Sequence, residues 1–339
     1  MKKWWSALIL LSGYCLVAAA AAQPLPQVSL GSIERLENFP SKYVDARHVD
    51  VWLPADYSAG KRYHVLYMQD GQMLFDAATT WNKQAWNVHE TVARLVNEGR
   101  IPDTIVVGIW NNGKYRYAEY YPEKFLSFAD KAVRRDYIAR AQLGKARADN
   151  YLRFIVKELK PAIDRKYATR PEAASTFVMG SSMGGLISLY ALSEYPQVFG
   201  GAACLSMHWV GRPTAWGAPP VLRNAGLPLA AFNYLRKRLP DPQTHRLYMD
   251  HGTAGLDAIY GTFQAFADEI LRERGYTDAA WQTRVFEGAA HDERSWAERV
   301  EIPILFLFGK TAAKDNGEVD MCFDCGEMPE PVPAILAPD

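Results

Sequence analysis

The sequence carries no excess of charge of either sign. Its 38 Lys and Arg residues balance 38 Asp and Glu residues, so the formal net charge at pH 7 is +0. A basic run interleaved with aromatic residues is typical of a nucleic-acid-binding surface, and this sequence has no such run. We therefore expect no nucleic-acid partner. A hydrophobic content of 49% is enough for an ordinary globular protein with a sizeable core.

Cysteine is also scarce. Besides Cys15, the chain has only Cys204, Cys322 and Cys325. Cys322 and Cys325 form a C-x-x-C motif, but there is no second cysteine pair to complete a zinc site and no βαβ setting for a thioredoxin-like motif. We expect no metal or organic cofactor, a local disulfide between these two cysteines in an oxidising compartment, and a buried strand thiol at Cys204.

The N-terminus has the order of a secretory signal peptide. Lys2 and Lys3 precede an apolar run at 4–17, and small residues follow at 18–22. A charged, an apolar and a small-residue region in this order predict export with cleavage close to residue 22. The apolar run is too short to be favoured as a membrane anchor. The sequence therefore predicts a secreted or periplasmic protein with no stable membrane anchor after cleavage.

The sequence predicts three segments along the chain. They are a signal peptide at 1–22, one folded domain at 23–310, and a tail at 311–339. The tail is rich in Asp, Glu and Pro and shows no hydrophobic periodicity, which is typical of a mobile segment.

Strands and helices are expected to alternate within the folded domain. Several expected strands are continuous apolar runs, as in strands covered on both faces of a sheet. The expected strands are 48–53, 64–69, 104–110, 176–179, 202–207, 246–250 and 283–286, and the expected helices are 86–97, 149–167, 183–195, 256–274 and 292–300. This alternation predicts an α/β fold with a mostly parallel central sheet and helices on both faces. We expect strand 48–53 to be antiparallel and Asp149 to cap its helix.

Residues 111–148 fall outside this pattern. The segment is rich in tyrosine and in charged residues. Long connections in compact domains are often functional, so one interpretation is a cover over a functional site. The other is an excursion on the surface.

The segment 176–190 contains the motif most specific for chemistry, G-x-S-x-G with Ser182 at its centre. An apolar strand precedes the motif and a helix begins at Met183, which is the context of a nucleophile elbow. Gly180 and Gly184 lie two residues either side of the serine, where a Cβ would clash across the turn. The helix N-terminus offers free N–H groups that can stabilise an oxyanion. The alternative is a glycine-rich turn with a solvated serine.

A serine nucleophile needs a base to take its proton and a carboxylate to orient that base. His291 is the candidate base, because it lies on a small-residue loop between the last strand and a helix. His208, which follows a strand, is expected to line the pocket. Asp257, on a loop, and Asp250, at the end of the preceding strand, are both candidate acids. The structural alternatives are a solvated side chain for His291, a strand-end residue for Asp250 and a first-turn helix residue for Asp257.

With these residues in place, the chain resembles the putative-esterase branch of the α/β-hydrolases. This branch includes enterochelin esterases, feruloyl and acetyl-xylan esterases, S-formylglutathione hydrolases and mycolyltransferases. The motifs that carry the resemblance are Leu66-Tyr-Met-Gln-Asp-Gly-Gln72 with Phe75, Trp86-Asn87, Gly180-Ser-Ser-Met-Gly-Gly185, Gly252-Thr253 with Asp257, and His291 with Trp296. The resemblance as a whole spans roughly residues 40–309, whereas the tail has no counterpart.

The resemblance implies an α/β-hydrolase fold and roles for particular residues. By similarity Ser182 is the nucleophile, His291 the base and Asp257 the acid, although extra residues between Thr253 and Asp257 depart from the family pattern. The resemblance also implies that the backbone N–H groups of Gln72 and Met183 donate hydrogen bonds to the oxyanion. A glycine turn after a strand, as at Gly71, can aim such an N–H into a cleft. The residues expected to line the substrate pocket are Asp70, Trp86, His208 and Trp209.

These observations predict a secreted serine esterase that acts through an acyl-enzyme, without metal or cofactor. Its expected partner is a small-molecule or carbohydrate ester of feruloyl, acetyl or siderophore type. Two alternatives remain open, an acyltransferase that uses a sugar acceptor and a non-catalytic carbohydrate- or siderophore-binding protein. The oligomeric state is not predicted.

Overall fold

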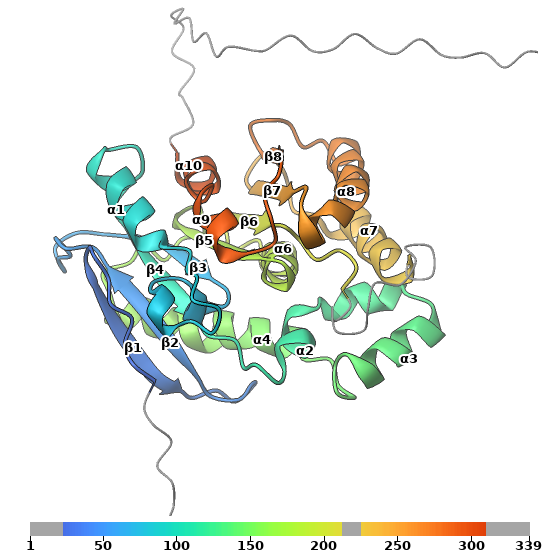
Figure 1. Ribbon diagram of the computed structural model, residues 1–339, viewed down its shortest axis with the longest axis horizontal. Helices are drawn as coiled ribbons and strands as arrows, with labels where there is room; N and C mark the ends of the chain where they lie inside the picture. Colours follow the sequence, from blue (N-terminus) through green and yellow to red (C-terminus); the bar gives the residue numbers. More distant parts are fainter. Residues whose placement is uncertain (1–22, 212–224, 310–339) are drawn as a thin grey trace, which may run out of the picture. The chain divides into compact units, whose positions relative to one another are not determined.

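The computed structural model describes residues 23–211 and 225–309, which include one eight-stranded sheet. In sheet order the strands are β1 (Ser32–Phe39), β2 (Arg47–Leu53), β4 (Thr104–Ile109), β3 (His64–Met68), β5 (Thr176–Ser181), β6 (Gly201–Leu205), β7 (Arg246–Gly252) and β8 (Trp281–Phe286) (Figure 1). β2 is antiparallel to both of its neighbours, and all other pairs are parallel. The predicted mostly parallel sheet with an antiparallel first part is confirmed.

The central strands are buried on both faces, which explains their continuous apolar sequences. Side chains of a strand alternate between its two faces. In β3, Val65 and Tyr67 belong to one hydrophobic core, whereas Leu66 and Met68 belong to the other. Each face of the sheet therefore has its own core. Cys204 of β6 is fully buried, as predicted, and burial raises the pKa of its thiol.

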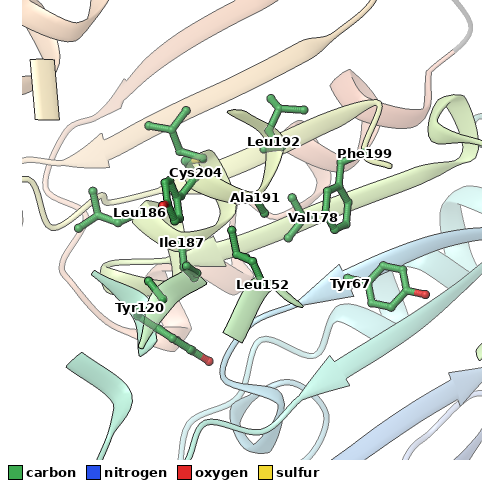
Figure 2. Packing of buried hydrophobic residues seen from close by; sticks show 14 of the residues in the cluster. Tyr67, Tyr120, Leu152, Val178, Leu186, Ile187, Ala191, Leu192, Phe199 and Cys204 are labelled. Carbon is green, nitrogen blue, oxygen red and sulfur yellow. The ribbon is translucent and has the colours of Figure 1, made fainter. Parts of the chain in front are cut away.

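Helices cover both faces of the sheet. The core on one face is formed with α4 (Ala148–Phe154), α5 (Lys160–Lys166), α6 (Met183–Glu194), α7 (Gly226–Arg238) and α8 (Gly261–Glu273). The core on the other face is formed with α1 (Val88–Asn97), α9 (Glu293–Ala297) and α10 (Glu301–Phe308). Figure 2 shows part of the first core, to which Leu186, Ile187 and Ala191 of α6 and Val178 of β5 all belong. This arrangement confirms the predicted helices on both faces.

Several elements differ from the sequence-based expectation. The helix expected at 149–167 is divided into α4 and α5 by a π-helical turn at Ile155–Leu159. It begins at Ala148, so Asp149 is in the first turn and does not cap the helix; its carboxylate accepts a hydrogen bond from the Tyr190 hydroxyl. Strand β1 was not expected, because its sequence SIERLENF mixes charged and apolar residues and the strand is only partly buried.

The segment 111–148 is largely helical. It contains α2 (Arg116–Tyr120), a 3-10 helix at Glu123–Phe128 and α3 (Lys131–Arg140). Helices α7 and α10 were not predicted either; α10 has the sequence EIPILFLF, whose continuous apolar run lacks helical periodicity. Within the described ranges, no helix is both long and apolar enough to cross a membrane. The predicted signal peptide, the tail and its C-x-x-C lie outside the described residues.

Replacing Gly71 with alanine should destabilise the protein. A Cβ at Gly71 would lie 2.4 Å from the carbonyl carbon of Gly108 and 2.5 Å from its oxygen, which are backbone atoms of β4. We expect the free energy of unfolding, measured with urea, to fall by about 1–3 kcal/mol, the usual cost of overpacking. Gly60→Ala is the control, since only the Ser58 hydroxyl, at 3.5 Å, lies near its Cβ. Equal stability of the two variants would contradict the close packing of this turn on β4.

Candidate active site

Ser182 occupies a strained turn between β5 and α6. Its φ of 57° and ψ of −123° lie in a region that residues with a side chain rarely adopt. The turn is tight enough that a Cβ on Gly180 would lie 2.7 Å from the carbonyl group of Gly184. The strand, the turn and the helix thus have the geometry that the G-x-S-x-G motif predicts. Ser182 is partly exposed, whereas Ser181 is buried in β5.

His291 and Asp257 are hydrogen-bonded to each other. His291 lies on the turn between β8 and α9, and Asp257 lies on a 3-10 helix (Gly255–Ile259) that follows β7. The Nδ1–H of His291 donates to Oδ1 of Asp257 over 2.6 Å. The Asp257 side chain is fully buried, and that of His291 is 16% exposed. Since Nδ1 carries the proton in this bond, Nε2 of a neutral His291 is left as an acceptor.

The second oxygen of Asp257 is also held by the protein. Its Oδ2 accepts from the Ser206 hydroxyl at 2.5 Å and from the Gly252 N–H at 2.7 Å. Burial by itself would raise the pKa of Asp257, but the hydrogen bonds from His291 and Ser206 outweigh it and lower the pKa. The carboxylate is therefore both ionised and fixed in orientation.

Asp250, the other candidate acid, has a different partner. It is buried in β7, and both of its oxygens accept from Arg299, at 3.1 and 3.2 Å. The Tyr248 hydroxyl donates to it as well, at 3.2 Å. Burial raises the pKa of Asp250, and the Arg299 charge opposes that rise. Asp250 thus belongs to a buried ion pair, whereas Asp257 contacts the histidine.

Ser182 lies at the same edge of the sheet as these residues. It follows β5, and Asp257 and His291 follow β7 and β8, which run parallel to β5 in one sheet. Within the described ranges the Ser182 hydroxyl makes no hydrogen bond, so Ser182 and His291 are not joined in this structure. Hydrogen bonds of catalytic groups are often long without substrate and shorten in the complex.

Two backbone N–H groups are free to bind a ligand, that of Met183 next to Ser182 and that of Gln72 in the turn after β3. In the part of the chain that the structure describes, neither the Met183 N–H nor the Gln72 N–H has an acceptor. Met183 begins α6, so its N–H is one of the unpaired donors of a helix N-terminus. Gln72 lies in a short 3-10 turn, Gly71–Met73, directly after Asp70.

The turn that carries Gln72 is fixed by Asp70. This residue has a left-handed backbone conformation, with φ 55°. Its carboxylate accepts two hydrogen bonds from Arg116, at 2.8 and 2.7 Å, and one from Asn111 at 2.7 Å. Its N–H donates to the Tyr120 hydroxyl at 3.2 Å. The segment 111–148 therefore contacts the site through α2, and Asp70 is engaged in an ion pair rather than free.

The aromatic residues expected in the pocket are buried. Trp86 and Trp209 are 3% and 1% exposed. Trp86 packs against Trp296 at 5.5 Å between ring centroids, and Trp296 contacts His291 edge-on at 5.1 Å. The indole N–H of Trp209 donates to Gln264 at 3.2 Å. Both tryptophans thus offer little surface to a substrate, and Trp86 supports the histidine through Trp296.

His208 is also buried and is close to the nucleophile. Its backbone N–H donates to the carbonyl oxygen of Ser182 at 3.3 Å, and its side-chain Nδ1 is hydrogen-bonded to the Tyr260 hydroxyl at 2.6 Å. The Tyr260 ring packs against His291 at 5.7 Å. His208 therefore links the serine turn to the surroundings of the histidine.

Three residues at the site were not singled out from the sequence. They are Ser206, Arg116 and Arg299. Ser206 lies within the predicted strand 202–207, so nothing marked it as functional, whereas in the structure it directly follows β6. The arginines had no signal either, because their partners are 46 and 49 residues away. No group of three or more His, Cys, Asp or Glu side chains able to hold a metal ion occurs within residues 23–211 and 225–309.

Comparison with known proteins places the chain in a family. Residues 42–302 match the family model described as "Putative esterase". Among curated proteins, the uncharacterized protein YbbA of Bacillus subtilis is 23% identical over 272 residues, which cover 78% of this chain and 93% of that protein.

Solved structures share the fold. The ferulic acid esterase AmCE1/Fae1A of the anaerobic fungus Anaeromyces mucronatus has a TM-score of 0.55 and 20% identity, over 86% of this chain and 95% of that one. The enterobactin esterase FES of Shigella flexneri has a TM-score of 0.58 and 17% identity, over 84% of this chain and 60% of that one.

The structural likeness agrees with the sheet order and with the strand–turn–helix at Ser182, and it confirms the α/β-hydrolase fold. The family model covers far more than half of the sequence. The chain therefore belongs to the "Putative esterase" family and is a carboxylic ester hydrolase of the α/β-hydrolase fold.

Proposed function

We propose that the protein is a serine esterase in which Ser182 is the nucleophile, His291 the base and Asp257 the acid. The observation that carries the proposal is the 2.6 Å hydrogen bond from His291 to Asp257, at the sheet edge where Ser182 lies in its strained turn. Asp257 keeps the imidazole in the tautomer whose Nε2 can accept a proton, and it stabilises the imidazolium that then forms.

The reaction proceeds in two steps. As Ser182 attacks the ester carbonyl, His291 takes the hydroxyl proton and then gives it to the leaving alcohol, which leaves an acyl-enzyme. In the second step, His291 takes a proton from water, the resulting hydroxide attacks the acyl group, and the proton returns to Ser182. The N–H groups of Gln72 and Met183 donate to the oxyanion in both steps. Their lack of an acceptor within the described residues supports this role.

We propose a small or sugar-linked ester of feruloyl, acetyl or siderophore type as the substrate. The support is the fold shared with a ferulic acid esterase and an enterobactin esterase. We also propose that the enzyme acts in the periplasm or outside the cell, which the composition of residues 1–22 supports.

Ser182→Ala should abolish turnover, with kcat lower by about 10⁴- to 10⁶-fold, because only binding and oxyanion stabilisation remain. A fluorophosphonate probe should label the wild-type protein once and should not label this variant. Ser181→Ala is the matched control, since Ser181 is buried in β5 and not at the tip of the turn; it should keep most of the activity. Interchanged effects of the two variants would contradict the assignment, and an unlabelled wild-type protein would point to a binding protein.

Asp257→Asn and Asp250→Asn should affect different properties. The first removes the charge beside His291 and favours the wrong tautomer, so kcat should fall at least about a hundredfold, a cautious margin on the 10⁴-fold effect known for a serine protease. The second leaves Arg299 buried without its counter-ion, so it should lower the free energy of unfolding by about 3–5 kcal/mol and change kcat far less. The measurements are kcat on one activated ester and urea unfolding. A folded, inactive Asp250→Asn beside an active Asp257→Asn would transfer the acid's role to Asp250.

A panel of acetyl, butyryl, octanoyl and feruloyl esters, together with an acylated sugar, tests the substrate class. We expect the highest kcat/KM on the feruloyl ester or the acylated sugar, and a lower value on the octanoyl ester. Release of free acid is measured with and without a sugar acceptor, and Ser182→Ala is the blank. A preference for the octanoyl ester would contradict the proposed substrate class. Acyl transfer to the sugar with no release of free acid would show an acyltransferase.

A further inference from the structure

Ser206 lies behind the Asp257 carboxylate in an unusual conformation. It directly follows β6 and is completely buried. Its φ of 45° is in the left-handed region, which non-glycine residues seldom occupy. The backbone is held there by the Ser206 N–H, which donates to the carbonyl oxygen of Asp250 at 2.8 Å. Such a strained, buried residue persists only where its surroundings determine it, and it points to a functional role.

The hydrogen bonds of the Ser206 hydroxyl have a fixed direction. A hydroxyl has one proton to donate and two lone pairs that accept. Both lone pairs are used, because the indole N–H of Trp296 and Nη2–H of Arg299 each donate to the Ser206 oxygen at 3.0 Å. The proton is therefore left for Oδ2 of Asp257, at 2.5 Å.

This hydroxyl connects Asp257 to a buried cation. Arg299 is 3% exposed and also donates to Asp250, so its charge is balanced. Donation from Arg299 into the Ser206 oxygen polarises the hydroxyl and strengthens its bond to Asp257, as in cooperative chains of hydrogen bonds. With Oδ2 held by Ser206 and by the Gly252 N–H, Oδ1 is directed to His291.

Building on the function proposed above, we propose that Ser206 is a positioning residue for ester hydrolysis, which orients Asp257 and shares its negative charge with Arg299. Ser206 acts through Asp257 and touches neither substrate nor the reacting atoms. The titratable and charged groups packed around this chain of contacts are Tyr248, Asp250, Tyr260, His208, Arg299 and, next to His291, Asp292 and Glu293.

The test is Ser206→Ala, with Ser193→Ala as the matched control. Ser193 of α6 is also buried, and its hydroxyl donates to the Leu189 carbonyl of its own helix. We expect Ser206→Ala to lower kcat by about 10- to 100-fold, the cost of a small misplacement in an active site, with KM little changed. Ser193→Ala should keep the wild-type kcat.

The pH dependence of kcat/KM separates positioning from a purely structural role. Without the Ser206 donor, Oδ2 of Asp257 keeps only the Gly252 N–H, so the carboxylate is less well oriented and more of its negative charge is available to His291. The protonated imidazole is then stabilised, so the acid limb of the profile should move to higher pH by roughly 0.5 unit. A residue needed only for folding would change the melting temperature and leave this midpoint where it is.

A double-mutant cycle checks that Ser206 acts through Asp257. On the Asp257→Asn background, Ser206→Ala should cause little further loss of kcat, because the carboxylate on which it acts is gone. Wild-type kcat and pH profile in folded Ser206→Ala, or the same fold-loss on both backgrounds, would overturn the inference.

If Ser206→Ala does not fold, the same measurements of kcat and of the pH profile are made on Ser206→Gly. Glycine also lacks the hydroxyl, and it adopts a positive φ without strain. Both variants should still be labelled by a fluorophosphonate, more slowly than the wild type, because Ser182 is intact. Absence of labelling in the wild-type protein would contradict the proposed esterase function itself, and a folded, fully active glycine variant would contradict only the role of Ser206.

Discussion

The parallel pairing of β3, β5, β6, β7 and β8 is the constraint on which the site depends. In this register Ser181 lies beside Leu205, and Leu205 lies beside Asp250. The residues that follow each strand therefore emerge next to one another at a single edge, as is general for ligand sites of α/β sheets. Ser182 and Ser206 are two of these residues, and the loops after β7 and β8 add Asp257 and His291. No local segment brings these side chains together by itself.

Two buried ion pairs hold elements together around this edge. Arg299 with Asp250, and Arg47 with Glu119, have nearly all of their side-chain surface removed from water. Burying ions is costly, and such pairs define geometry better than they add stability. Two hydrogen bonds join the side chains of each pair, which fixes the orientation of one side chain relative to the other.

The short helix α2 shows how a segment with little core of its own is held in place. Its Glu119 accepts two hydrogen bonds from Arg47 of β2, at 2.8 Å each. Its Arg116 holds Asp70, which precedes the turn with the Gln72 N–H. The segment 111–148 therefore connects the antiparallel part of the sheet to the site, and its tyrosines are mostly part of the core beneath it.

Sequence patterns determined most of the architecture, because they reflect local physics. Continuous apolar runs identify strands that are covered on both faces, and the glycines around Ser182 are required by a turn too tight for a Cβ. The same reasoning missed β1, whose charged, half-exposed residues gain their order from pairing with β2. It also missed α10, where apolar residues on all sides hide the helical period.

The contacts between distant residues were decided only by the tertiary structure. Asp250 and Asp257 are both plausible acids in the sequence, and their partners depend on the pleat of β7 and on the loop after it. The pleat directs Asp250 to Arg299, and the loop carries Asp257 to His291. Ser206 is an ordinary serine in the sequence, and it gains its fixed proton direction only from donors 90 and 93 residues away. Local periodicity carries no information about such pairings, because they depend on which strands become neighbours and in which register.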